Sequence, residues 1–312
     1  MTIPGVLTTG NIVVDILTRP VDEIQWGGTR WVESISPSLG GNGANTSAAI
    51  GKLGVPVRLI GAIGQDAFAE IVLSRLAECG VDTSAIQRLA AGTATTVALV
   101  KSDGTRAFLH QPGVGRLLFS EPFLLTRENT AGFTRLHIGN PFAILHLRNF
   151  APSLLAQAKS LGLATSLDTA WDALGEWMHV LAPCLPHTDV LFANEDEGLM
   201  LTGSHDPEKI WKFLKKAGAN TLVLKCGAKG SIVFNRDETT HVPPFPVEAI
   251  DTTGAGDCYA GAFLSALQRD LPMPKAALIA NAVGALNVQA LGATTGLLDW
   301  EGTLKWVQNR QL

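Results

Sequence analysis

A turn of small residues that ends in a carboxylate is the part of this sequence best suited to chemistry. It reads D-T-T-G-A-G-D over residues 251–257, here called the anion turn, and it leads into apolar residues at helical spacing: Ala260, Phe263, Leu264 and Leu267. A helix N-terminus presents unpaired backbone N–H groups and the positive end of the helix dipole, so it attracts anions. Gly254 and Gly256 would let the backbone approach a phosphate, with Ala255 between them. Asp257 is placed to accept a proton from a hydroxyl that attacks that phosphate.

A second glycine-rich stretch, G-G-N-G-A-N over residues 40–45, precedes an alanine-rich segment that ends in Leu53-Gly54. The glycines, Gly41 among them, would let the chain lie against a polar ligand. The side-chain amide of Asn45 offers both a donor and an acceptor to hydroxyl groups. Plainer interpretations stay open for both stretches, since Asp257 and Asn45 are also residue types that cap helices.

Further polar residues follow short apolar runs that are typical of strands. Asp15 comes after the run at residues 12–14, and Asn194 and Glu197 come after the run at residues 190–192. Asn194 and Glu197 are three positions apart, so they share one face of a starting helix. A third run, at residues 221–224, leads into K-C-G-A-K-G, in which Lys225, Gly227 and Gly230 could border a nucleotide. A turn Asp, an acidic first helical turn and surface lysines are the ordinary alternatives.

These residues are spread over alternating strand-like and helical segments. Residues 6–9, 58–63, 136–138 and 164–167 are further short β-rich runs, and residues 66–79 repeat apolar side chains at helical spacing. Such alternation predicts an α/β fold with a mostly parallel central sheet that helices cover on both faces. Residues 19–38 lack a helical period, and residues 95–111 predict a hairpin around Asp103-Gly104. Together these two segments could form a small separate sheet.

Composition narrows the function further. The chain has 312 residues with a net charge of −4 and no basic tail or stripe, which argues against nucleic acid as a partner. No apolar run is long enough to span a membrane and no signal peptide is visible, so we expect a cytoplasmic protein. The four cysteines are widely spaced, as in a reduced protein without disulfides. The P-loop and nicotinamide-binding glycine motifs are both missing.

The anion turn and the stretch at residues 40–54 resemble the two signatures of the ribokinase-like (PfkB) carbohydrate kinases, in the same order along the chain. The resemblance extends from Gly10 to about Gly292 and includes the segments at Asp15, Asn194 and Lys225. It implies a three-layer α/β/α fold in one domain over residues 1–312. It also implies a β-sheet lid formed by about residues 12–38 and 95–111, through which two copies pair as a homodimer in many members of the family.

The resemblance further implies a role for each motif. Asp257 would be the general base, and the amides of residues 254–257 would hold the transferring phosphoryl group. The sugar would contact Asp15, Gly41, Asn45 and Asn140. ATP would contact Asn194, Lys225, Gly227, Gly230 and Asn281. Glu197 would act on Mg²⁺ mostly through its waters, and Asp251 would border a monovalent cation such as K⁺ in those members that use one.

We therefore expect a kinase that uses ATP and Mg²⁺ to phosphorylate a small sugar or sugar-like molecule. A nucleoside kinase of the same family is the nearest alternative, because Trp26, Trp31 or Phe108 of the lid could stack on a base. A sugar or nucleotide sensor without catalysis is a third. The sequence leaves the identity of the acceptor open: Asn140 lies where some ribokinases carry an acidic residue that meets the sugar, and Asp168 and Trp171 follow another strand near the expected cleft.

Overall fold

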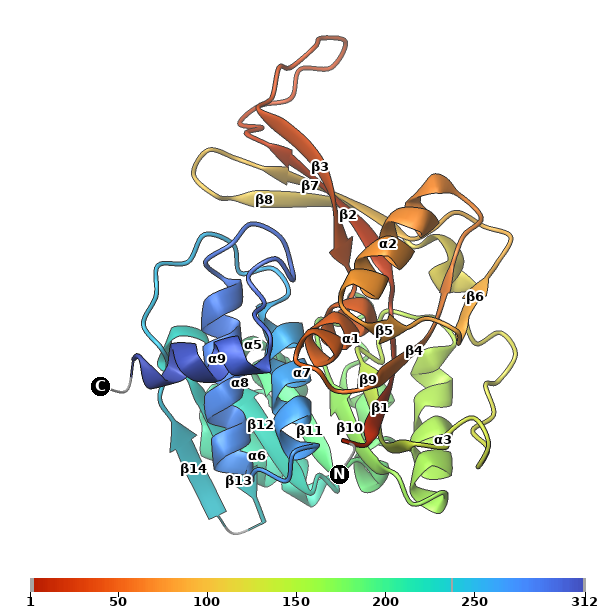
Figure 1. Cartoon of the computed structure of the whole chain (residues 1–312), viewed down its shortest axis with the longest axis vertical. Coiled ribbons are helices and arrows are strands. Elements are labelled where there is room, and N and C mark those ends of the chain that lie inside the picture. Colours follow the sequence, from red (N-terminus) through yellow and green to blue (C-terminus); the bar gives the residue numbers. More distant parts are fainter. Residues whose placement is uncertain (1–2, 237, 311–312) are drawn as a thin grey trace.

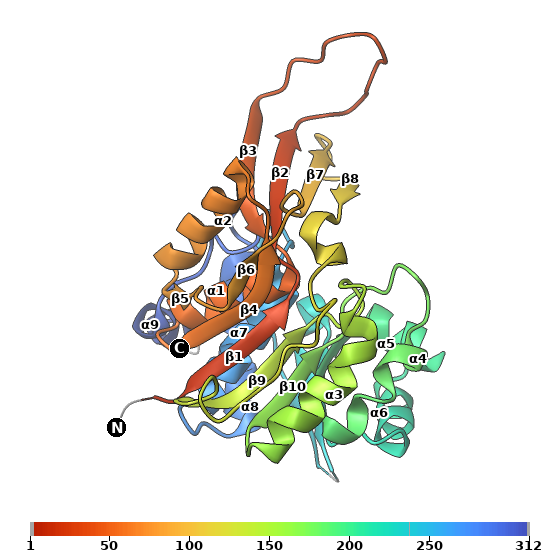
Figure 2. The same ribbon diagram turned by 90° about the vertical axis from the view of Figure 1, so that its right-hand side faces the viewer.

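The computed structural model describes residues 3–236 and 238–310 and contains a large sheet with helices on both faces (Figures 1 and 2). Its strands run in the order β14-β13-β12-β11-β10-β9-β1-β4-β5, with β6 paired to β4. The strands from β12 through β5 pair in parallel, while β13 and β14 are antiparallel at one edge. The bounds are β1 Gly5–Gly10, β4 Val57–Ile63, β5 Val81–Asp82, β6 Ile86–Arg88, β9 Phe133–Gly139, β10 Ala164–Asp168, β11 Val190–Asn194, β12 Thr221–Lys225, β13 Ser231–Asn235 and β14 Glu238–Val242.

Helices form a layer on each side of this sheet, as Figure 2 shows along its edge. One layer contains α1 (Asn42–Lys52), α2 (Ala67–Glu78), α7 (Ala255–Leu267), α8 (Met273–Asn287) and α9 (Trp300–Gln308). The other contains α3 (Leu147–Ser160), α4 (Met178–Leu181), α5 (Glu195–Thr202) and α6 (Pro207–Lys216). Short 3₁₀ turns lie at Gly113–Arg116, Leu185–His187 and Gly227–Lys229.

The core is divided by the sheet because successive strand residues face opposite sides. Leu191 of β11 packs in the cluster that includes Leu154 of α3, whereas its neighbour Phe192 packs against Phe263 of α7. Strand β11 is therefore buried on both faces of the sheet, which explains why its sequence before Asn194 is an unbroken run of apolar residues. The predicted three-layer fold with a mostly parallel sheet is confirmed.

A second, smaller sheet stands away from the large one (Figure 1). Its order is β3-β2-β7-β8, with bounds β2 Val13–Arg19, β3 Ser34–Gly40, β7 Thr95–Val100 and β8 Arg106–Gln111. The predicted hairpin is present, and the left-handed Gly104 (φ 84°) lies in its turn. Of the second predicted segment, residues 19–38, only the two ends join this sheet: Arg19 ends β2 and residues 34–38 belong to β3, which continues to Gly40, whereas residues 20–33 form the connection between the two strands. Within the described residues, no helix has both the length and the apolar character needed to cross a bilayer.

Candidate active site

The motifs converge where the parallel strands of the large sheet end. Asn140 follows β9, Asp168 ends β10, Asn194 ends β11 and Lys225 ends β12. The carboxyl ends of parallel strands meet at one edge of an open α/β sheet, and ligands of such folds bind there. The start of α7, which carries Asp257, lies at this same edge, since Asp257 and Lys225 are close enough for their charges to act on each other.

Asp257 is held by two asparagine side chains from the start of α1. The amide of Asn42 donates to Oδ1 at 2.7 Å, and the amide of Asn45 donates to Oδ2 at 2.9 Å. The N-cap of α7 is Gly254, which has left-handed backbone (φ 70°) and makes no side-chain cap. The capping interpretation of Asp257 is therefore wrong, and so is that of Asn45: Gly41 is the N-cap of α1, and the amide of Asn45 is directed at Asp257.

Close packing of α1 on α7 makes this contact possible. A Cβ added to Gly261 of α7 would lie 2.7 Å from Cβ of Ala49 and 2.8 Å from the carbonyl oxygen of Thr46. Glycine and alanine at this crossing let the two helices approach until side chains of one reach the first turn of the other. The small residues at the crossing of α1 and α7 thus position Asp257 against Asn45.

The surroundings of Asp257 raise the pKa of its carboxyl group above the usual value. Burial is the largest cause, and the negative charge of Asp168 adds to it. The hydrogen bonds from Asn45 and Asn42 and the charge of Lys225 act in the opposite direction by favouring the carboxylate. A carboxylate with a raised pKa that still ionises is a better proton acceptor than an exposed aspartate.

One buried polar atom beside Asp257 is available to a ligand. Oδ1 of Asn45 is buried without a hydrogen-bond partner among the described residues, although its amide nitrogen is used. Asn140 has left-handed backbone (φ 74°), and its side-chain oxygen accepts hydrogen bonds from the backbone N–H groups of Phe142 and Ala143. Its side-chain NH₂ group donates to Oδ1 of Asn42 at 3.1 Å. Asn140 therefore orients Asn42, and the acceptor left open in this chain of amides is that of Asn45.

A buried ion pair lies beside the anion turn. Nζ of Lys225 is 2.7 Å from each carboxylate oxygen of Asp168, and both side chains are largely buried. Burial acts to lower the pKa of Lys225, but the charges of Asp168 and Glu197 outweigh it and raise that pKa. A Cβ at Gly256 would lie 3.2 Å from Nζ, so this ammonium group borders the turn itself. Lys229, by contrast, is exposed and pairs with Glu195.

Asn194 and Glu197 form a capping box at the start of α5. The Asn194 oxygen accepts the backbone N–H of Glu197 at 2.8 Å, and Glu197 Oε2 accepts the backbone N–H of Asn194 at 2.8 Å. Oε2 also accepts the hydroxyl of Thr169 at 2.7 Å. Burial raises the pKa of Glu197, Lys225 lowers it, and Asp168 raises it further. These contacts fix Glu197 beside the Asp168–Lys225 pair.

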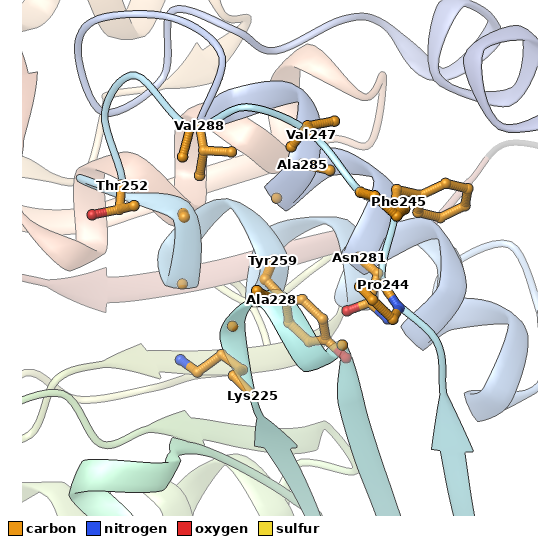
Figure 3. A pocket seen from close by; sticks show the side chains of 17 residues that line it. Lys225, Ala228, Pro244, Phe245, Val247, Thr252, Tyr259, Asn281, Ala285 and Val288 are labelled. Carbon is orange, nitrogen blue, oxygen red and sulfur yellow. The ribbon is translucent and has the colours of Figure 1, made fainter. Parts of the chain in front are cut away.

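A cavity of ≈ 470 Å³ extends from the anion turn along α8 (Figure 3). Lys225 and Thr252 lie at one end of it, and Pro244, Phe245 and Asn281 lie at the other. Much of the remaining wall is formed by Gly227, Gly230, Gly256 and Gly284 and by the side chains of Val247, Tyr259, Ala285 and Val288. The Asn281 amide donates to the carbonyls of Val242 and Pro243, so it fixes the segment that forms this apolar end.

Asp15 reaches the site from β2 of the small sheet. Its pKa is raised to about 6, mainly by burial; a hydrogen bond with Thr96 acts against this, and the charges of Asp257 and Asp251 add to it. A Cβ at Gly40 would lie 2.1 Å from Oδ2 of Asp15, so the glycine leaves room for the carboxyl group. Gly41 has φ 88°, and a Cβ there would meet the carbonyl oxygen of Asn11 at 2.4 Å.

Asp251 begins the anion turn and is almost fully buried. Oδ1 accepts the backbone N–H of Thr253 at 2.8 Å, and Oδ2 accepts that of Gly292 at 2.9 Å. Arg106 of β8 adds a guanidinium group 2.9 Å from Oδ1. Burial acts to raise the pKa of Asp251, but these N–H groups and the arginine hold it below the usual value.

Three contributors to this site had no assigned role from sequence. Asn42 had a usable signal, since it lies in G-G-N-G-A-N three positions before Asn45 and so on the same helical face. The sequence places Asp168 after a strand near the expected cleft, but it gives no sign of the partner Lys225, which is 57 positions away. Arg106 carried no signal, because an arginine at a hairpin strand is ordinarily a surface residue.

Known proteins resemble the chain over nearly its whole length. The sequence pattern of the pfkB family carbohydrate kinases matches residues 8–300. The ATP-dependent ribose-1-phosphate kinase of Halopiger xanaduensis is 30% identical, over 92% of this chain and 93% of that protein.

Solved structures share the fold. The Arabidopsis thaliana ribokinase complexed with ribose and ATP superposes with a TM-score of 0.85 over 99% of each chain, at 24% identity. A putative ribokinase II from E. coli, in complex with ATP and Mg²⁺, also gives a TM-score of 0.85, over 98% of this chain and 99% of that one, at 26% identity.

Proposed function

The chain belongs to the pfkB family of carbohydrate kinases, and from that premise we propose that it transfers the γ-phosphoryl group of ATP to a hydroxyl of a small sugar. One observation carries the proposal. The carboxylate of Asp257, buried and bound by Asn42 and Asn45, lies in the first turn of α7, beside backbone N–H groups suited to a phosphate. A proton acceptor and an anion site within one helical turn are what transfer to an alcohol requires.

We place ATP in the cavity that runs from the anion turn along α8. Its apolar end, near Pro244 and Phe245, suits a nucleobase, and Asn281 lies beside it. Gly227 and Gly230 border the same cavity without side chains that would fill it. The phosphates would then extend toward Lys225 and the turn, where an ammonium group and N–H donors offset their charge.

The carboxylates near this path suit a magnesium ion held mainly by phosphates and water. Among residues 3–236 and 238–310, no group of three Asp, Glu, His or Cys side chains is arranged to hold a metal. Mg²⁺ commonly keeps several waters and takes only one or two protein carboxylates, so this donor set fits it. Glu197, oriented by Asn194, would hold such waters, and the bound ion would offset charge on the transferring group.

The acceptor sugar would lie between the small sheet, acting as a lid, and the start of α1. Asp15 offers a carboxyl group from the lid side, and the unused Asn45 oxygen offers an acceptor beside Asp257. Gly41 lets backbone approach the ligand, and Asn140 contributes by orienting Asn42. One hydroxyl of the sugar would then face Asp257.

In the reaction, Asp257 takes the proton of this hydroxyl as its oxygen bonds to the γ-phosphorus. The bond from that phosphorus to the β–γ bridging oxygen breaks, and ADP carries away the electron pair. Because charge on the phosphoryl oxygens must be stabilised in the transition state, the amides of residues 254–257 and the ammonium group of Lys225 are the main catalytic donors.

The kinase is expected to act as a lid-paired homodimer in the cytoplasm. Ile35 and Leu109 expose apolar side chains on the face of the small sheet opposite to Arg106, and a second copy would cover this face. Free thiols at all four cysteines suit a reducing compartment. Light scattering of the purified protein tests the dimer, and Ile35→Lys with Leu109→Lys should yield monomers; a monomeric wild type would contradict it.

A coupled ADP-release assay across acceptors tests the function. The panel should include pentoses, hexoses, sugar acids, nucleosides and ribose 1-phosphate, the last because the relative from Halopiger xanaduensis is named for it. We expect turnover with a sugar or sugar phosphate. Turnover with nucleosides alone would favour the nucleoside kinase, whose proposed stacking residues Trp26 and Trp31 are here 94% and 90% exposed. A ligand that binds tightly and is never phosphorylated would contradict the kinase.

A further inference from the structure

Arg106 connects the small sheet to the anion turn. It begins β8, yet its guanidinium Nη1 is 2.9 Å from Oδ1 of Asp251 and also donates to the hydroxyl of Thr253. The Asp251 side chain is 1% exposed, and that of Arg106 is 22% exposed. A mostly buried charge pair therefore joins a strand of one sheet to the segment that precedes α7.

The Asp251 carboxylate is surrounded by hydrogen-bond donors. The backbone N–H of Thr253 donates to Oδ1, and the backbone N–H of Gly292 donates to Oδ2. Arg106 places its positively charged guanidinium group beside Oδ1. A monovalent cation, by contrast, needs oxygen lone pairs directed at it. The N–H groups of Thr253 and Gly292 already use lone pairs of both Asp251 oxygens. A cation bound beside the Arg106 guanidinium would also be repelled by its positive charge.

The residues present at Asp251 therefore do not fit the monovalent cation that the family resemblance raised as an expectation. What they do fit is a site whose positive charge is supplied by the protein. Asp15 and Asp257 are close enough to influence one another electrostatically, and Asp251 acts on Asp15, so three acidic groups gather here. A cationic group at Asp251 offsets this charge next to the place where phosphates must bind.

We propose that Arg106 takes the place of a monovalent cation at Asp251, so that the phosphoryl transfer proposed above proceeds without K⁺. This inference rests on the proposed kinase function. Arg106 acts as a positioning residue: it neutralises Asp251 and holds the Thr253 hydroxyl, and Thr253 immediately precedes the N-cap glycine of α7. Because β8 carries it, the charge is in place only while the small sheet lies against the turn.

The first test compares turnover in K⁺ with turnover in the same concentration of tetramethylammonium, which is too large for such a site. Wild-type kcat should be the same in both. Arg106→Ala should lower kcat about tenfold to a hundredfold without K⁺, through the loss of charge-assisted hydrogen bonds. K⁺ should restore part of this loss by entering the vacated site, and Arg106→Lys should retain more activity than Arg106→Ala.

Arg30→Ala is the matched control. Arg30 lies in the β2–β3 connection of the same small sheet, half exposed and 3.6 Å from Asp22, and the Arg30→Ala variant should behave as wild type in both salts. A wild type activated by K⁺ would overturn the proposal. An Arg106→Ala variant with wild-type kcat in tetramethylammonium, or one that K⁺ does not restore, would do so as well.

A second readout needs no turnover and separates this inference from the kinase proposal. K⁺ and tetramethylammonium should give the same wild-type Tm, because no ion binds at Asp251. Arg106→Ala should gain Tm saturably with K⁺, and Arg106→Ala with Asp251→Asn should lose that gain. A saturable K⁺ stabilisation of the wild type that Asp251→Asn removes would overturn the inference, even for a protein that phosphorylates no acceptor.

Discussion

Asn45 and Asp257, which are 212 positions apart in the sequence, meet in a hydrogen bond of 2.9 Å. The bond joins the two glycine-rich stretches through the first turns of α1 and α7. One residue offers an open acceptor oxygen and the other a carboxylate with a raised pKa. A hydroxyl bound between them would be oriented by the first and deprotonated by the second.

Removing the amide of Asn45 should change the pH dependence of the reaction. Its N–H bond favours the ionised form of Asp257, so in Asn45→Ala the pKa of Asp257 rises further. The acid limb of the pH profile of kcat/KM should therefore move up by about one pH unit, given the usual strength of a hydrogen bond to a charged group. Asn149→Ala, on the exposed side of α3, is the control and should leave the limb in place. An unmoved limb in Asn45→Ala would remove Asn45 from the account.

The Asp168–Lys225 pair should matter for both stability and nucleotide binding. Lys225→Met leaves a buried carboxylate without its partner, so the free energy of unfolding should fall by about 3–5 kcal/mol, and the KM for ATP should rise. Lys229→Met breaks only an exposed pair with Glu195 and should leave both quantities unchanged. Denaturant titration and initial rates measure the two effects. If both variants had the same free energy of unfolding and the same KM for ATP, Lys225 would have no role in stability or nucleotide binding beyond that of the exposed Lys229.

Two helical glycines should respond oppositely to an added methyl group. At Gly261 the new Cβ would meet Ala49 at 2.7 Å, so Gly261→Ala should cost about 1–3 kcal/mol of stability and separate α1 from α7. Gly284 of α8 has its nearest neighbour at 3.9 Å, so Gly284→Ala should be neutral or stabilise by about 0.5–1 kcal/mol. Thermal unfolding compares them, and a stable Gly261→Ala with full activity would argue against the required close approach.

Asp15 should make the protein less stable as its carboxyl group ionises. Its folded-state pKa is raised to about 6 from 3.8, so the protonated form is favoured by folding. This contribution is complete below the unfolded pKa and is lost as pH rises through about 6. Asp15→Asn should therefore be more stable than wild type at neutral pH, by about 1–2 kcal/mol, with the difference fading toward acid pH.

The same substitution should weaken acceptor binding. Asp15→Asn replaces a charged acceptor of hydroxyl hydrogen bonds with a neutral one, so the KM for the sugar should rise while the KM for ATP stays the same. Urea titrations across pH and steady-state rates check the two halves separately. A variant that is less stable than wild type at neutral pH would contradict the first half, and an unchanged sugar KM the second.

Local sequence pattern predicted the parts of the fold that local forces determine. The unbroken apolar strands, the helix after the anion turn and the hairpin around Asp103-Gly104 each follow from residue spacing, and the structure contains all three. The site depends on strand order as well. Asp168 meets Lys225 because β10, β11 and β12 are adjacent, and Arg106 meets Asp251 because the small sheet lies near α7. Periodicity within one segment carries no information about such pairings, so these contacts could not be predicted.

The central claim is that Asp257 deprotonates the acceptor, and the most direct measurement is kcat of Asp257→Asn with the best acceptor found in the panel. We expect kcat to fall about 10²–10⁴-fold, as for loss of a general base, while the KM for ATP and the Tm stay close to wild type. A kcat near that of wild type would contradict the account.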